Sequence, residues 1–99
     1  VTRILINPKN RKAYGVQFYR DGMLQMAIAR REVVISAGTI NSAQILMLSG
    51  VGPRAHLQQL GIPVIHDLKV GHNLQDHAGF AGLTFIVDKP VAIVQNRLQ

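Results

Sequence analysis

The first thirty residues alternate between apolar and polar positions with the two-residue period of β-strands. Val1–Ile6 and Ala13–Arg20 both follow this period, and residues 7–10 between them, Asn-Pro-Lys-Asn, have turn chemistry. Asp21-Gly22 is a strong signal for a tight hairpin, after which Met23–Ala29 returns with alternating apolar residues. The pattern therefore predicts an antiparallel meander of three strands.

The run from Val33 to Ala37 is apolar without clear alternation and ends at Gly38. A continuous apolar run bounded by glycine is typical of a strand that is buried on both faces. Gly38 at its carboxyl end lets the backbone turn sharply and lets another group approach without a Cβ atom in the way. Because ligands in open α/β sheets lie beyond the carboxyl ends of the strands, this run predicts a ligand-binding α/β domain.

A helix is expected directly after Gly38. Thr39 or Asn41 can cap it, and the helical pattern extends to about Leu48. Apolar side chains surround much of its circumference, which is typical of a helix buried inside a larger protein. Ninety-nine residues can hardly cover such a helix on all sides, so we expect a segment of a longer chain.

A second, shorter helix is predicted over residues 54–60, because Pro53 suits a first helical position and Gly61 a position just past the end. Beyond it the pattern predicts an extended segment, a polar loop, a strand and the start of another helix, over residues 62–65, 67–77, 79–87 and from 91 onward. The expected fold class is α/β, as an α+β segment with an antiparallel meander, a buried strand and short helices.

Composition fits a globular protein, with 47% hydrophobic and 16% charged residues. No apolar run approaches the roughly 20 residues that span a bilayer, so no membrane span is predicted. With no cysteine, disulfides and thiolate chemistry are excluded within these residues, which is compatible with secretion or with the cytosol. The chain opens without Met and stops in mid-pattern, so we expect an internal segment of a longer protein.

The net charge of +6 raises the question of nucleic-acid binding. The eleven Lys and Arg residues are spread from Arg3 to Arg97, and no stacking aromatic residues are interleaved with them. We interpret them as a solvated face and expect no nucleic acid as a partner.

Gly50-Val51-Gly52 has the spacing of half a dinucleotide-binding turn. Ala55 stands where the third glycine of that turn would be, and the segment follows a predicted helix instead of a strand. The interpretation as a helix stop is therefore favoured over a phosphate site.

The sequence offers no convincing catalytic or metal-binding set. Asp76 beside His77 could pair a base with an orienting carboxylate, but neighbours on an extended segment point opposite ways, which favours a structural role. A metal site would need three or four convergent ligands, and no metal motif contains the four histidines. The serines lack the glycine-flanked elbow of a nucleophile. The histidines considered are His56, His66, His72 and His77, and the serines are Ser36, Ser42 and Ser49.

The polar loop Val70–His77 gathers hydrogen-bonding side chains around Gly71 and Leu74. Such a loop can cover a polar ligand, with donors from amides and acceptors from carboxylates. It can equally be a turn that satisfies its own polar groups, and the spacing alone leaves both interpretations open.

Three groups of residues together resemble the glucose–methanol–choline (GMC) oxidoreductase family. They occur in the family's order and spacing across essentially the whole chain, and residues 84–91 resemble its insect glucose dehydrogenase branch in particular. Ala43 departs from the family, where many members have proline, and so does His72, where others often have Glu. The three groups are Ser36-Ala37-Gly38 through Ser49-Gly50-Val51-Gly52-Pro53, Leu57 to Gly61-Ile62-Pro63-Val64, and Val70-Gly71 through Asn73-Leu74-Gln75-Asp76-His77.

The resemblance implies part of a Rossmann-like FAD-binding domain over residues 1–78 and the start of a substrate-binding domain over residues 79–99. It implies a parent enzyme that oxidises small alcohols or sugars by proton abstraction and hydride transfer to the flavin, with oxygen, a quinone or another carrier as electron acceptor. A non-catalytic relative that keeps the fold as a binding module is the alternative.

Carried over singly, the cofactor-binding positions of the family fall on Val1, Ala37, Gly38, Asn73 and Asp76. The family's Gly-x-Gly-x-x-Gly turn and its catalytic histidine, paired with His or Asn, match nothing in this chain. The resemblance therefore assigns no catalytic residue here, and we expect the 99 residues by themselves to be inactive.

Overall fold

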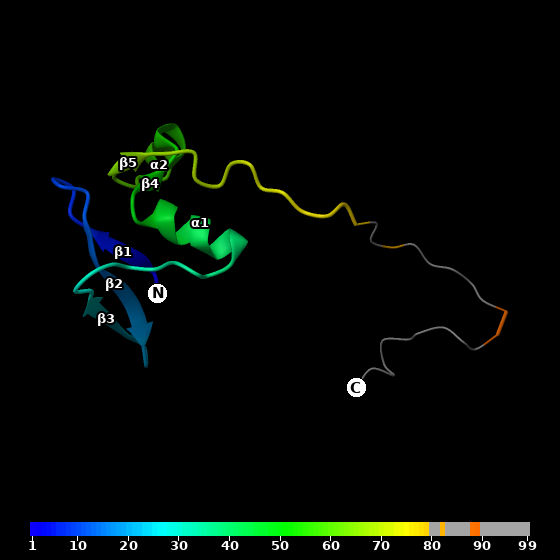
Figure 1. Cartoon of the computed structure of the whole chain (residues 1–99), viewed down its shortest axis with the longest axis horizontal. Helices are drawn as coiled ribbons and strands as arrows, with labels where there is room; N and C mark the ends of the chain where they lie inside the picture. The colour runs from blue at the N-terminus through cyan, green and yellow to red at the C-terminus, as the bar shows by residue number, and fades with distance from the viewer. Residues whose placement is uncertain (80–81, 83–87, 90–99) are drawn as a thin grey trace.

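The computed structural model describes residues 1–79, Gly82, Asp88 and Lys89. The expected strand over residues 79–87, the expected helix from Val91 and nearly all of the expected start of a substrate domain lie outside these residues. In Figure 1 the elements form a three-stranded sheet, a helix beside it and a small β-α-β unit. They are β1 (Arg3–Ile6), β2 (Ala13–Arg20), β3 (Met23–Ile28), α1 (Thr39–Leu48), β4 (Val51–Gly52), α2 (Arg54–Gln59) and β5 (His66–Asp67).

The predicted meander is confirmed. β1 pairs with β2 and β2 with β3, all antiparallel, and the sheet order follows the chain. The turn between β2 and β3 has φ values of 51° at Asp21 and 75° at Gly22. A two-residue turn with both central residues left-handed has the twist of the flanking strands, which is why this dipeptide makes a hairpin.

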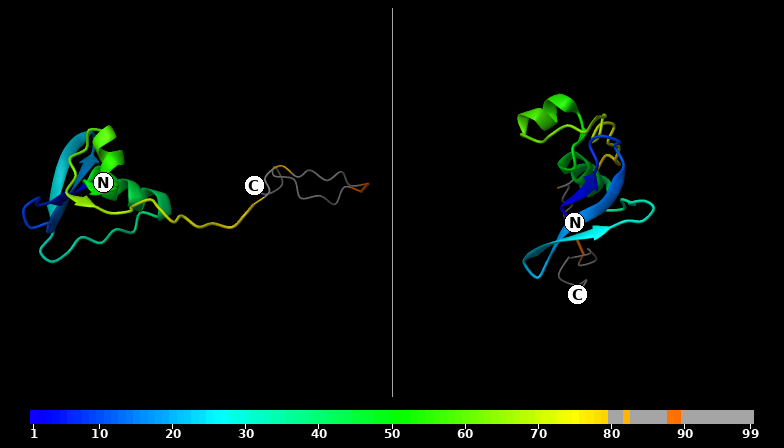
Figure 2. Two further views of the ribbon diagram at one scale, coloured as in Figure 1. Left: turned by 90° about the horizontal axis from the view of Figure 1, so that it is seen from above. Right: turned by 90° about the vertical axis from the view of Figure 1, so that its left-hand side faces the viewer.

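The prediction of a buried strand over Val33–Ala37 is wrong for this chain. The segment runs from β3 to α1 without pairing to any described strand (Figure 2), and the Val34 side chain is 76% exposed. A strand that is buried on both faces needs neighbours on both sides, and the described residues supply none. The apolar pattern indicates that the segment is suited to a buried position. It forms a strand only where neighbouring strands accept and donate its backbone hydrogen bonds.

Helix α1 begins at the expected place, but the expected cap is wrong. Gly38, with φ 85° and ψ 170°, precedes the helix, and Thr39 is its first residue. No side chain among the described residues caps it; instead the Gly38 carbonyl oxygen accepts the Ser42 amide at 3.0 Å. No α1 residue is buried and Ile40 is 74% exposed, so the expectation that these residues cannot cover the helix is confirmed.

The Gly50-Val51-Gly52 segment ends α1, as predicted. Gly50 has φ 86°, and its amide donates to the Met47 carbonyl oxygen at 3.0 Å. The chain then enters β4, which pairs in parallel with β5 across α2. Sequence analysis missed β4 and β5 because strands of two residues have no periodicity to detect.

Few apolar side chains are buried in the described part of the chain. Ile4 and Leu5 of β1 are 6% exposed, and Leu57 of α2 is fully buried. Several large apolar side chains of the meander are instead more than half exposed, namely Tyr19, Met23, Leu24, Met26 and Ile28. Burial is therefore concentrated where β1, the end of α1 and the β-α-β unit meet.

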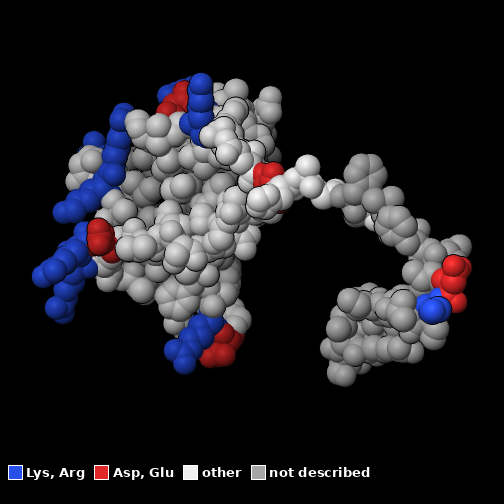
Figure 3. Space-filling view, turned by 45° about the vertical axis from the view of Figure 1, so that its right-hand side comes forward, with Lys and Arg blue, Asp and Glu red and all other residues white. Residues whose placement is uncertain are grey.

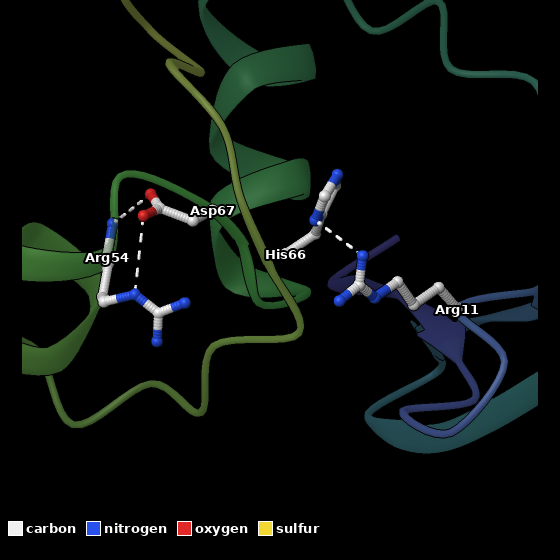
Figure 4. A network of polar contacts seen from close by, with 4 residues as sticks. All are labelled: Arg11, Arg54, His66 and Asp67. Carbon is white, nitrogen blue, oxygen red and sulfur yellow. Dashed lines mark hydrogen bonds and ion pairs between the residues drawn. The ribbon is translucent and has the colours of Figure 1, made fainter.

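Two polar contacts tie the β-α-β unit together and to the meander (Figure 4). The Arg11 guanidinium lies 3.3 Å from Nδ1 of His66, which joins the turn after β1 to β5. Asp67 accepts the Arg54 backbone amide at 3.0 Å through Oδ1 and approaches Arg54 Nε at 3.4 Å through Oδ2. Because Arg54 is the first residue of α2, Asp67 satisfies one of the free amides at the start of that helix.

Removing the carboxylate of Asp67 tests this contact. We expect Asp67→Ala to lower the free energy of unfolding of the full-length protein by about 1 kcal/mol, since an amide at a helix start loses its acceptor. Asp67→Asn keeps an oxygen acceptor and removes only the charge of an exposed ion pair, so its effect should stay below about 0.5 kcal/mol. Urea unfolding of both variants checks this, and equal losses would contradict the assigned role of the amide contact.

Candidate functional site

A groove lies between the start of the chain, the extended segment before α1 and the first turns of α1. Its volume is about 500 Å³, which is within the usual range for ligand sites. β1 and β2 supply one wall and α1 the opposite wall. We call it the β1–α1 groove; its lining residues are Val1, Ile4, Val16, Val33, Val34, Ile35, Ser36, Ala37, Asn41, Gln44 and Ile45.

The end of the extended segment is held at this groove by Ser42 of α1, through both its side chain and its backbone. The Ala37 amide donates to Oγ of Ser42 at 3.1 Å, and the Gly38 carbonyl oxygen accepts the Ser42 amide. One serine thus fixes both residues. A Cβ atom built on Gly38 would meet no atom of the chain within 4 Å, so the space beside this glycine is open.

The groove is neutral. Among the described residues that line it, none has a charged side chain, and its polar rim consists of Ser36, Asn41 and Gln44. In Figure 3 the Lys and Arg side chains project from the periphery of the molecule. An apolar wall with uncharged donors and acceptors suits a flat heteroaromatic ring with polar edges better than it suits a phosphate.

A second cavity, also of about 500 Å³, lies between α1 and the polar loop. Gly71 to Gln75 form its loop side, and Thr39, Ile40, Ala43, Gln44 and Met47 form its helix side. Gln44 is the residue common to the two cavities.

The five sequence-predicted cofactor residues divide between these places. Val1 and Ala37 line the β1–α1 groove together, although they are far apart in the sequence. Gly38 itself lines neither cavity; it lies between Ala37, which lines the groove, and Thr39, which lines the second cavity. Asn73 lines the second cavity and has φ 58°. Asp76 lines neither; its Oδ1 accepts the backbone amide of His77 at 2.7 Å. Their roles as cofactor contacts stay predictions.

Sequence reasoning missed the α1 side of the groove. The sequence pattern marks Asn41 as a possible helix cap and Ser42 as a serine of the first family motif, and it assigns neither residue to a groove. Their positions three and four residues after Gly38 are the available signal, because residues in the first turn of a helix face the chain that enters it.

Neither a metal site nor a membrane-spanning helix is found in the described part of the chain. No three His, Asp or Glu side chains there lie close enough together to hold a metal ion. None of its helices is long and apolar enough to cross a bilayer.

Comparison with known proteins gives a consistent result. The family model described as GMC oxidoreductase matches residues 1–79. An ecdysone oxidase of Bombyx mori is 50% identical over 78 residues, which are 79% of this chain and 11% of that protein. An oxygen-dependent choline dehydrogenase of Sinorhizobium medicae is 46% identical over 86% of this chain and 16% of its own length.

Two further similarities extend this result. Versicolorin B synthase of Aspergillus parasiticus is 52% identical over 77% of this chain and 12% of its own length. A solved FAD-dependent oxidoreductase from Chaetomium thermophilum superposes with a TM-score of 0.62 at 39% identity, covering 69% of this chain and 12% of that one. The chain thus spans between about a tenth and a sixth of the length of these relatives.

Proposed function

The chain belongs to the GMC oxidoreductase family, and on that premise we propose that it is part of an FAD-dependent oxidoreductase acting on CH–OH groups of alcohols or sugars. Residues 1–78 would belong to the FAD-binding domain and residues 79–99 to the start of the substrate-binding domain. The proton-abstracting residue of such an enzyme lies outside these 99 residues.

The observation that carries the proposal is the shared groove of Val1 and Ala37. These two positions were assigned to the cofactor by resemblance, and they line one cavity of about 500 Å³. Its neutral, largely apolar lining fits a nucleotide ring. Bound FAD supplies the acceptor for the hydride that leaves the substrate carbon. Val1 and Ala37 would form the wall on which the cofactor rests, and the Ser42 hydroxyl keeps Ala37 in place through its backbone amide.

The relatives support a cofactor role for this segment over a substrate role. Three proteins whose names refer to three different compounds, ecdysone, choline and versicolorin B, are 50%, 46% and 52% identical to it. A segment that is about equally similar to all three is expected to serve a feature common to them, such as the cofactor, and not a substrate that differs among them. We therefore place the determinants of the substrate in the remainder of the protein, together with those of the electron acceptor.

Gly38→Ala tests the proposal in the full-length protein. Gly38 has φ 85° and ψ 170°, a conformation that essentially only glycine adopts, so alanine there costs about 1–3 kcal/mol of stability. Its methyl group would meet no described atom within 4 Å. If FAD rests against this glycine, the methyl group also reaches into the cofactor. We expect the dissociation constant of FAD, measured by flavin fluorescence, to rise at least about tenfold.

Gly61→Ala is the matched control, since Gly61 also has a left-handed φ, 67°, and open space around a Cβ atom. It lies after α2 and, unlike Gly38, has no sequence neighbour that lines either cavity, so Gly61→Ala should lower stability by about 1–2 kcal/mol and leave FAD affinity unchanged. Equal FAD affinity in the two variants would contradict the placement of the cofactor at Gly38. A full-length protein that binds no FAD at all would overturn the proposed function.

A further inference from the structure

Ser49 is the buried polar side chain of the described residues, with 6% of its surface exposed. It follows α1 directly and lies against β1. Its Oγ accepts the backbone amide of Ile4 at 2.7 Å, and its hydroxyl donates to the carbonyl oxygen of Ile45. One hydroxyl therefore joins the middle of β1 to the last turn of α1.

The two residues that Ser49 connects are on opposite walls of the β1–α1 groove. Ile4 lines it from β1 and Ile45 lines it from α1, whereas Ser49 itself is absent from its lining. β1 is an edge strand of the described sheet, so its outward amides have no strand partner there. The Ile4 amide, which is buried, is satisfied instead by the serine.

We propose that Ser49 is a positioning residue that sets the separation of the two walls of the β1–α1 groove and thereby the affinity for the cofactor. The inference rests on the proposed function, because it assumes that FAD occupies this groove. Ser49 acts through the backbones of Ile4 and Ile45 and does not touch the ligand.

The chemistry of this link requires an oxygen that both accepts and donates. The Ile45 carbonyl oxygen also accepts the Ser49 backbone amide at 3.1 Å, so it keeps one partner without the hydroxyl. The Ile4 amide has no such second acceptor among the described residues. Loss of the hydroxyl therefore leaves a buried donor unsatisfied, which favours water entry and separation of β1 from α1.

The test compares three variants of the full-length protein with the wild type. Ser49→Ala removes the hydroxyl. Ser49→Thr keeps it and adds a methyl group, for which there is room because Ser49 borders a separate hollow of about 250 Å³. Thr2→Val is the matched control: the Thr2 hydroxyl donates to the Gln17 carbonyl oxygen at 3.1 Å. Its removal weakens a link between β2 and the residue before β1, and none between β1 and α1.

Two quantities are measured for each variant: the melting temperature, and the FAD dissociation constant at a temperature well below the melting temperature of every variant. We expect Ser49→Ala to raise the dissociation constant about tenfold, Ser49→Thr to keep it within about twofold of wild type, and Thr2→Val to lower only the melting temperature. If Ser49→Ala gives no soluble protein, Ser49→Cys replaces it, because its sulfur is a weak acceptor of similar size and should raise the constant too.

An unchanged dissociation constant in Ser49→Ala or its Cys substitute, with a lowered melting temperature, would reduce Ser49 to a purely structural contact and overturn the inference. The same holds if Thr2→Val weakens FAD binding as much as Ser49→Ala. If the wild-type protein binds FAD and the Ser49 variants bind it with the same dissociation constant, the inference fails and the proposed function stands. If the wild-type protein binds no FAD, the proposed function itself fails.

Discussion

Gly50→Ala is expected to lower the free energy of unfolding of the full-length protein by about 4 kcal/mol, since two separate costs add at this position. Its φ of 86° is left-handed, which strains any residue with a Cβ atom. That Cβ atom would also lie 2.5 Å from the carbonyl oxygen of Pro63, a backbone atom that cannot rotate away. The Gly50 carbonyl oxygen in turn accepts the Ile65 and His66 amides at 2.8 and 3.1 Å, so a shift here disturbs the approach of β5.

The comparison that isolates the contact is Gly61→Ala. Gly61 has a similar φ, 67°, with no atom within 4 Å of its Cβ position, so it should show only the strain of about 1–2 kcal/mol. Urea unfolding of the FAD-free protein measures both. A Gly50→Ala variant no less stable than Gly61→Ala would show that the chain around Pro63 gives way, and would refute the crowding argument.

Gly15→Ala is expected to lower the free energy of unfolding by about 2 kcal/mol, for a different reason. Gly15 lies in β2 opposite Ile28, and its Cβ atom would lie 2.4 Å from the carbonyl oxygen of Ala27. Its backbone conformation does not demand glycine, so the loss comes from crowding alone. Relief requires β2 and β3 to move apart, which weakens the pairing of the hairpin and with it the Val16 side of the β1–α1 groove.

Gly79→Ala is the control for this variant, because its Cβ atom would meet nothing within 4 Å and its φ is not left-handed. It should leave stability unchanged. The backbone amides that pair β2 with β3 should lose protection from hydrogen exchange in Gly15→Ala and keep it in Gly79→Ala. Full protection of those amides in Gly15→Ala would contradict the predicted separation of the strands.

The candidate site was only partly accessible from the sequence. Resemblance gave Val1 and Ala37, and the structure brings them to one groove. It did not give Asn41, Gln44 or the Ser49 link, since these depend on how α1 lies against β1. Asp76 is the opposite case, because the resemblance assigns it to the cofactor whereas it lines neither cavity in the described chain.

By itself the sequence determined the features that depend on neighbouring residues: the meander, the Asp21-Gly22 hairpin, the helices α1 and α2, and membership of the family. Local periodicity, turn chemistry and motif spacing are sufficient for these, because each is stabilised within a short stretch of chain.

Only the tertiary structure decided which of these elements meet. The apolar run Val33–Ala37 has the pattern of a strand and pairs with no strand among residues 1–79, because a sheet forms between strands and its hydrogen bonds need a partner. The walls of the groove, the parallel pairing of β4 with β5 and the burial of Ser49 likewise arise from contacts between segments far apart in sequence, which no local pattern records.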